Sequence, residues 1–185
     1  RYSWFMMKSL DQAEPEPAWP EGLQLQTQAD YTDLESILRA ADEAFEDHWG
    51  HVDRSGDPER MQRFIHSVET DPDHDPSLWF LAMDGDEIAG MALCSSRLGA
   101  DKETGVVETL GVRRPWRRQG LGLALLHQAF GMFQSRGYQR VGLGVDSQNL
   151  SGATRLYKKA GMEVTHEFVV YEKELRAGKE LSKQS

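Results

Sequence analysis

Apolar and polar positions recur along the chain with two different periods, and these periods predict where strands and helices lie. An apolar run at 106–112 predicts a buried strand. From Leu121 to Arg136, apolar residues recur every three or four positions, which predicts a helix, and Gly137 is placed to end it. A short segment rich in arginine and glycine joins the strand to the helix. We take this strand, loop and helix as the centre of the chain.

Weaker patterns on both sides predict the remaining elements. Before the centre they predict a strand at 23–27, a helix capped by Asp30 that ends at Phe45, a helix after Pro58, and a hairpin of strands 78–83 and 87–95. After it they predict a strand at 141–146, a short helix from Ser151 to Ala160, and closing strands at 162–164 and 167–175. This order of strands and helices is typical of a mixed α/β domain.

The two ends of the chain have similar patterns. Residues 1–10 match residues 166–175 in aromatic and apolar positions, with Lys and Leu aligned. One hypothesis is an internal repeat, in which residues 1–10 are the last strand of an upstream domain of the same kind. The alternative is two unrelated strands that share a common alternation. Residues 11–20 read as an acidic, proline-rich linker, 21–175 as the domain, and 176–185 as a polar tail.

The arginine- and glycine-rich loop predicts an anion site. The first N–H groups of a helix have no intrahelical partner, and the helix dipole favours negative charge there. Gly120 and Gly122 allow close approach of a diphosphate, and arginine forks suit phosphate oxygens. The four arginines are Arg113, Arg114, Arg117 and Arg118. The Walker loop is excluded because no Lys-Ser/Thr follows the glycines, and the Rossmann pattern because Arg117 stands at its first glycine.

The segment from Arg117 to Gly122 resembles the acetyl-CoA-binding motif [RQ]-x-x-G-x-[GA] of the GNAT acyltransferase superfamily. The resemblance is strengthened by its context, a preceding Leu110-Gly111-Val112 strand end and a following Asn149 with the block 156–162. It implies a GNAT fold, with a mixed central sheet of about seven strands, flanking helices, and two splayed strands that form the acetyl-CoA cleft. The implied co-substrate is acetyl-CoA, with no metal.

The resemblance also implies roles for particular residues. The cofactor-binding residues would be Leu110, Gly111, Val112, Arg117, Arg118, Gln119, Gly120, Leu121, Gly122, Leu123 and Asn149. Tyr157 resembles the family's general acid, although an aromatic at helical spacing from two alanines is also typical of a core residue. For Gly111, Gly142 and Gly144 the resemblance implies backbone approach to the cofactor, and tight packing is the alternative.

Glu108 is the candidate general base. Its spacing from Leu110 and Val112 predicts that all three side chains share one face of the strand. A carboxylate within an apolar run is costly unless it is partnered or functional. The alternative is a glutamate at a solvated strand end. The family's variable substrate-facing loop corresponds to His48, Trp49 and His51, which either shape an acceptor pocket or plug the core.

Composition limits the partners. The chain has 30 acidic and 21 basic residues in 185, a formal net charge of −9, which argues against nucleic-acid binding. Cys94 is the single cysteine and reads as a buried thiol, so a reducing cytoplasm is the expected location. No apolar stretch is long enough to cross a bilayer, so no membrane partner is expected.

Three functions remain open from the sequence. The first is an N-acetyltransferase that moves acetyl from acetyl-CoA to a primary amine by direct attack within a ternary complex. The second is a non-catalytic acyl-CoA-binding or regulatory half of a tandem GNAT protein, for which an upstream GNAT domain would be the partner. The third, a thiol-cofactor synthase with a tandem arrangement resembling that of mycothiol synthase, rests on the repeat alone. The acceptor, a small molecule or a peptide amine, cannot be read from the sequence.

Overall fold

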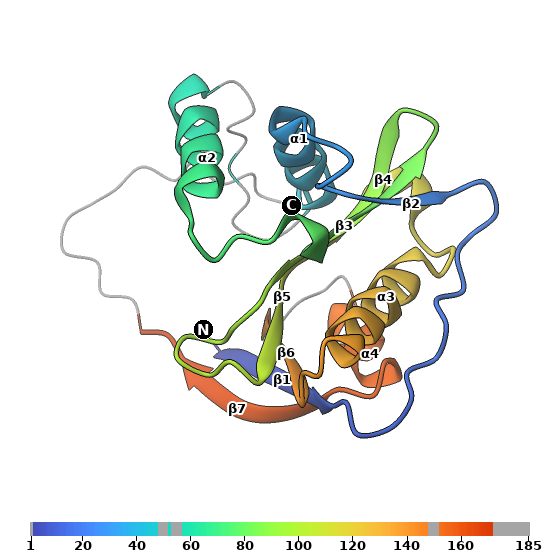
Figure 1. Cartoon of the computed structure of the whole chain (residues 1–185), viewed down its shortest axis with the longest axis vertical. Helices are drawn as coiled ribbons and strands as arrows, with labels where there is room; N and C mark the ends of the chain where they lie inside the picture. The colour runs from blue at the N-terminus through green and yellow to red at the C-terminus, as the bar shows by residue number, and fades with distance from the viewer. Residues whose placement is uncertain (1, 48–51, 53–56, 148–151, 172–185) are drawn as a thin grey trace.

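A computed structural model of the chain describes residues 2–47, 52, 57–147 and 152–171. This part of the chain folds around one seven-stranded sheet with the order β2-β3-β4-β5-β6-β1-β7 (Figure 1). The strands are β1 (Tyr2–Ser9), β2 (Gln24–Thr27), β3 (Trp79–Asp84), β4 (Glu87–Ser95), β5 (Thr104–Val112), β6 (Arg140–Asp146) and β7 (Glu163–Val169). The helices are α1 (Leu34–Ala44), α2 (Pro58–Thr70), α3 (Leu121–Ser135) and α4 (Ala153–Lys159), with 3-10 turns at Pro76–Leu78 and Arg114–Trp116. The mixed α/β class predicted from the sequence is confirmed.

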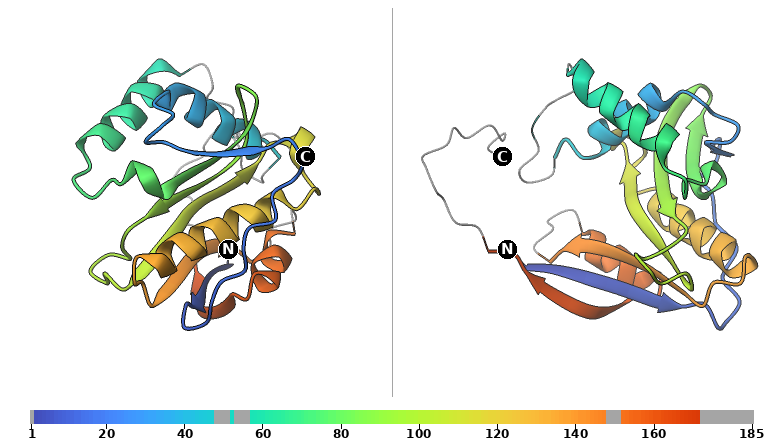
Figure 2. Two further views of the ribbon diagram at one scale, coloured as in Figure 1. Left: turned by 45° about the vertical axis from the view of Figure 1, so that its right-hand side comes forward. Right: turned by 60° about the vertical axis from the view of Figure 1, so that its left-hand side comes forward.

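Helices cover both faces of the upper part of the sheet. The larger core lies between α3 and the strands, and its fully buried members include Leu125, Phe130 and Phe133. A smaller core lies on the opposite face, where Ile37 of α1 packs against the strands. α1 and α2 stand together on that face, away from α3 and α4 (Figure 2). These apolar faces are the ones that the helical period predicted.

β5 and β6 form the only parallel pair of the described sheet, and they separate early. They pair over Thr104–Val106 and Arg140–Gly142 and not beyond. Past that point β5 continues upward with β3 and β4, while β6 continues with β1 and β7 (Figure 2). Among the described strands, the edge of β5 that faces β6 therefore has no partner from residue 107 onward. This is the splay that the sequence resemblance implied.

The N-terminal strand is built into this sheet. β1 pairs antiparallel with β6 on one side and with β7 on the other. Met6 is fully buried in the larger core, and the ring of Phe5 occupies the space where Gly142 lacks a side chain. Residues 2–9 are thus an interior strand of the domain that follows them. Their origin as the last strand of an upstream domain stays a prediction.

Two predicted element bounds are wrong. The cap of α1 is Asp33, whose carboxylate accepts from Ser36 N, whereas Asp30 accepts from the Thr27 hydroxyl. The two closing strands are one strand, β7, within the described residues. Its register against β1 shifts at Thr165, which is a β-bulge residue whose hydroxyl donates to Phe5 O at 3.2 Å. A bulge adds one residue without ending the strand pairing. The alternation of apolar and polar residues is therefore interrupted in the sequence although the strand continues.

The packing of β5 against α3 gives a stability prediction. A Cβ on Gly105 would lie 2.4 Å from the Phe133 ring, which is itself fully buried. Gly105→Ala is therefore expected to destabilise the fold by about 1–3 kcal/mol through overpacking. The matched control is Gly131→Ala within α3, where nothing lies within 4 Å of the new Cβ. That variant should gain up to about 1 kcal/mol from helix propensity. Urea unfolding measures the stability of both variants. Equal stabilities would contradict the close packing of Gly105 against Phe133.

Candidate anion and acyl-transfer site

The loop before α3 presents a row of unpaired backbone N–H groups. Arg118 has φ +63° and Gly120, the N-cap of α3, has φ +88°. Leu123 N and Ala124 N both donate to Gly120 O. Within the described residues, the N–H groups from Arg118 to Gly122 have no acceptor. Left-handed turns next to a helix N-terminus direct such groups to one side, so we call residues 118–122 the anion nest.

Three of the four arginines do not face this nest with free guanidiniums, contrary to the prediction from the sequence. Arg117 donates to Val112 O at 2.9 Å and Ala44 O at 3.0 Å and pairs with Asp47 at 2.6 Å. Arg113 pairs with Glu43 and Glu87, and Arg114 with Glu46 and Asp47. Arg118 alone of the four has no partner in the described parts of the chain. The motif arginine therefore fixes the end of β5 to the end of α1.

The cause of this pairing is the acidic carboxyl end of α1. A helix C-terminus leaves carbonyl oxygens without N–H partners and carries partial negative charge, so cations are stabilised there. Residues 42–47 add four carboxylates to that end. The facing basic run at 113–118 supplies the complement. Sequence reasoning missed this match, although the acidic and basic runs were both visible.

The free edge of β5 exposes Leu110 and Val112 but not Gly111. Arg113 N donates to Ala89 O of β4 at 3.0 Å. Since backbone groups alternate in direction along an antiparallel strand, those of Gly111 point to β4 and those of Leu110 and Val112 point to the open side. Val112 O already accepts from Arg117. The prediction that Gly111 offers its backbone to a cofactor is therefore wrong.

Gly111 instead serves the packing of α1. A Cβ on this residue would lie 2.9 Å from the Ala44 Cβ and 3.2 Å from the Phe45 ring. Gly142 likewise makes room for Phe5, whereas a Cβ on Gly144 would meet nothing within 4 Å. Gly122 lies where α3, β5 and α4 meet, because its missing Cβ would be 3.1 Å from Leu156 Cδ2 and 3.8 Å from Val112 Cγ2. Packing thus explains most of these glycines.

Glu108 occupies a β-bulge. The strand face that it was predicted to share with Leu110 and Val112 is therefore interrupted. Leu93 pairs with Thr109 and Cys94 with Val107, which leaves Glu108 as the extra residue of β5. Val107 and Leu110 both pack into the larger core, and this is possible only if the alternation reverses between them. The Glu108 side chain is exposed. Bulges redirect side chains next to active sites, which is compatible with a role for this carboxylate.

Tyr157 lies on α4, one residue after the Leu156 that contacts the anion nest at Gly122. Its ring is buried in the larger core. Its hydroxyl has no hydrogen-bond partner among the described residues, and the residue keeps 8% of its surface exposed. Burial raises the pKa of Tyr157, so the phenol stays protonated at neutral pH. A protonated hydroxyl on a helix that packs against the loop can donate a proton.

Other predicted residues take no part or cannot be placed. Cys94 is a buried thiol, and burial, with a smaller contribution from the Glu108 carboxylate, raises its pKa. Asn149, His48, Trp49 and His51 lie outside the described residues. Across the described ranges no group of histidine, cysteine, aspartate or glutamate is arranged to hold a metal ion. The helices of those ranges are all too short or too polar to cross a bilayer.

Comparison with known proteins identifies the family of the chain. The model of the acetyltransferase (GNAT) family matches residues 7–162. The chain belongs to the GNAT family. The match begins within β1 and ends after α4, so it includes the anion nest, the free edge of β5 and Tyr157.

Several relatives of this chain are longer than it is. A mycothiol acetyltransferase of Thermobispora bispora is 32% identical over 167 residues, which are 87% of this chain and 53% of the relative. One of Streptomyces scabiei is 30% identical, over 92% of this chain and 51% of the relative. A crystal structure of a GCN5-related N-acetyltransferase from Sphaerobacter thermophilus has a TM-score of 0.80 and 36% identity, covering 100% of this chain and 55% of its own. The chain spans about half the length of the curated relatives it matches.

Proposed function

We propose that this chain is an N-acetyltransferase that uses acetyl-CoA and moves its acetyl group to a primary amine within a ternary complex. The observation that carries the proposal is the anion nest at the start of α3, next to the unpaired edge of β5. The nest suits the diphosphate of the co-substrate. Leu110 and Val112 would pair with its amide arm, as an additional strand pairs with a sheet edge.

The reaction needs a neutral amine, a route for two protons and a stabilised leaving group. The amine nitrogen attacks the thioester carbonyl carbon, a C–N bond forms and the C–S bond breaks. Tyr157 would give its hydroxyl proton to the departing thiolate of coenzyme A. The proton lost by the amine would pass to Glu108, directly or through water. After the products leave, Tyr157 regains a proton from solvent and Glu108 releases its proton to solvent.

Glu108 gives a prediction of moderate size. Glu108→Gln is expected to lower kcat by about tenfold, less than the 10²–10⁴ typical of an acid or base held in place, because solvent has access to the same amine proton. The pH dependence of turnover should shift, because the carboxylate no longer accepts a proton. The control is Glu163→Gln, which changes an exposed carboxylate on β7. An unchanged pH profile in Glu108→Gln would rule out the role as base.

The direct test is a calorimetric titration of the chain with acetyl-CoA, followed by an assay of acetyl transfer to a panel of amines. One-to-one binding and a transferred acetyl group are expected. The second candidate function, a non-catalytic half of a longer protein, is favoured by the length of the relatives and by the pattern shared between residues 1–10 and 166–175. Binding without transfer to any amine, including the acceptor of mycothiol acetyltransferases, would support that alternative.

A further inference from the structure

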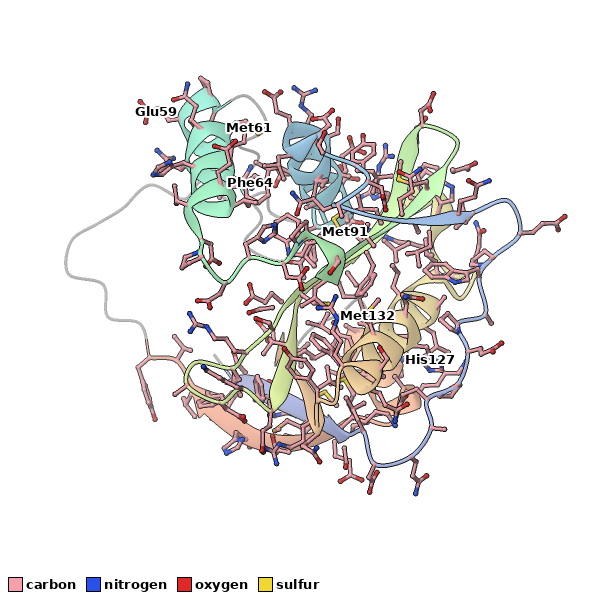
Figure 3. All side chains as sticks on the ribbon, viewed as in Figure 1. Glu59, Met61, Phe64, Met91, His127 and Met132 are labelled. Carbon is pink, nitrogen blue, oxygen red and sulfur yellow. The ribbon has the colours of Figure 1, made fainter. Side chains whose placement is uncertain are left out.

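A pocket of about 230 Å³ lies between α1, α2 and the sheet. Its lining residues are Ile37, Leu38, Ala41, Asp42 and Phe45 of α1, Arg60 and Phe64 of α2, Leu93 of β4 and Thr109 of β5. Phe64 reaches from α2 toward α1 (Figure 3) and stacks on Trp79 with ring centroids 6.2 Å apart. Since an apolar cavity of about 150 Å³ can hold benzene, this pocket has room for a short alkyl chain or one ring.

Among the described residues that line it, the pocket offers no unpaired charge. Its two ionic residues, Asp42 and Arg60, form a two-pronged pair with N–O distances of 2.6 and 2.7 Å. Hydrogen bonding to Asp42 raises the pKa of Arg60, so the guanidinium stays ionised. Apart from Thr109, the other lining side chains are aliphatic or aromatic. A ligand group that enters the pocket therefore gains the most binding free energy if it is apolar. An ammonium group that enters would lose its hydration without gaining a free carboxylate from the described lining.

The pocket adjoins the proposed site of transfer. Thr109 follows Glu108, and it lies three residues beyond Val106, where β5 leaves β6. Three strand residues span roughly 10 Å, within the reach of a small amine. Phe45 lines the pocket and also contacts Gly111, and the neighbouring Ala44 O accepts from Arg117 at the nest. The pocket and the co-substrate site thus share the end of α1.

We propose that this pocket selects the acceptor, and that it takes a primary amine whose substituent is a short, uncharged alkyl or aryl group. The inference rests on the proposed acetyl transfer and adds the substrate class. It disfavours polycationic amines, even though the acidic net charge of the chain would attract them. The apolar group would fill the pocket, and the amine would remain over β5 beside Glu108.

The test compares propylamine, butylamine and pentylamine with 1,4-diaminobutane, in which an ammonium replaces the terminal methyl of pentylamine. We expect kcat/KM to rise roughly fourfold for each added methylene, and the diamine to fall at least about tenfold below pentylamine because its second charge is buried without a partner. The same amines are titrated by calorimetry without acetyl-CoA. Amine binding is then measured whether or not transfer occurs, so failure of the pocket and failure of the acetyltransferase proposal can be told apart.

Two variants test whether the dependence on chain length arises in this pocket. Ala41→Leu fills the pocket from α1 and should abolish the dependence on chain length, in turnover and in amine binding. Arg39→Leu adds the same side chain on the exposed face of α1, where Arg39 is 60% exposed, and should preserve it. The inference would be overturned if kcat/KM of the unmodified protein did not depend on the chain length of the amine. It would also be overturned if this dependence were unchanged in Ala41→Leu. A third variant, Arg60→Met, leaves Asp42 unpaired and is expected to shift preference toward the diamine.

Discussion

Gly120→Asp is expected to abolish the binding of acetyl-CoA while leaving the chain folded. The substitution places a carboxylate at the N-cap of α3, among the N–H groups that the proposal assigns to the diphosphate. Like charges repel there, and the new side chain can itself accept the N–H groups, as N-cap aspartates do. Together these effects should weaken binding at least about a hundredfold. Calorimetric titration with acetyl-CoA measures the loss directly.

The chain supplies a matched control for this variant. Gly137 follows the other end of α3, with φ +82° against +88° for Gly120, and at neither position does an atom of the described chain lie within 4 Å of an added Cβ. Both Asp variants therefore meet similar backbone strain, about 1 kcal/mol since aspartate tolerates the left-handed region. Gly137→Asp should bind acetyl-CoA normally. Equal binding by the two variants would contradict the assignment of the anion nest.

Tyr157→Phe is expected to lower kcat by about 10²–10⁴-fold without weakening acetyl-CoA binding, because it removes only a proton donor. Stability should be unchanged, since the hydroxyl makes no hydrogen bond within the described chain. Burial raises the pKa of Tyr157 above its ordinary value, so the acid form persists at every pH up to that value of about 10. Turnover of the unmodified protein should therefore show no loss of this acid at pH 9.

Tyr138→Phe is the control for this second prediction. Tyr138 follows α3 and packs edge-on against Phe133, at the opposite end of the helix from the anion nest. Removal of the Tyr138 hydroxyl should leave kcat unchanged. Full turnover by Tyr157→Phe would exclude the role of Tyr157 as general acid. It would favour the alternative that Tyr157 is only an aromatic residue of the core, which its helical spacing also allowed. Steady-state assays with one amine and saturating acetyl-CoA separate these outcomes.

Local patterns in the sequence predicted much of the fold and the loop on which the candidate site is built. The helix from Leu121 with its stop at Gly137, the hairpin around Asp84–Glu87 and the helix after Pro58 all form where their periods and caps indicated. The arginine- and glycine-rich loop gave the position of the anion nest. These features depend on residues close together in the chain, so hydrophobic period, helix caps and positive-φ glycines are sufficient to locate them.

The partners of those elements were decided by contacts between distant residues. β1 lies between β6 and β7, the motif Arg117 binds the end of α1, Gly111 makes room for Phe45, and Glu108 leaves the alternation of β5 at a bulge. A period tells which face of a strand is apolar, but strand pairing and ion pairing join segments far apart in sequence. Only the folded chain shows which acceptors the arginines meet and which edge of β5 stays open, because both follow from where β6 and α1 come to lie.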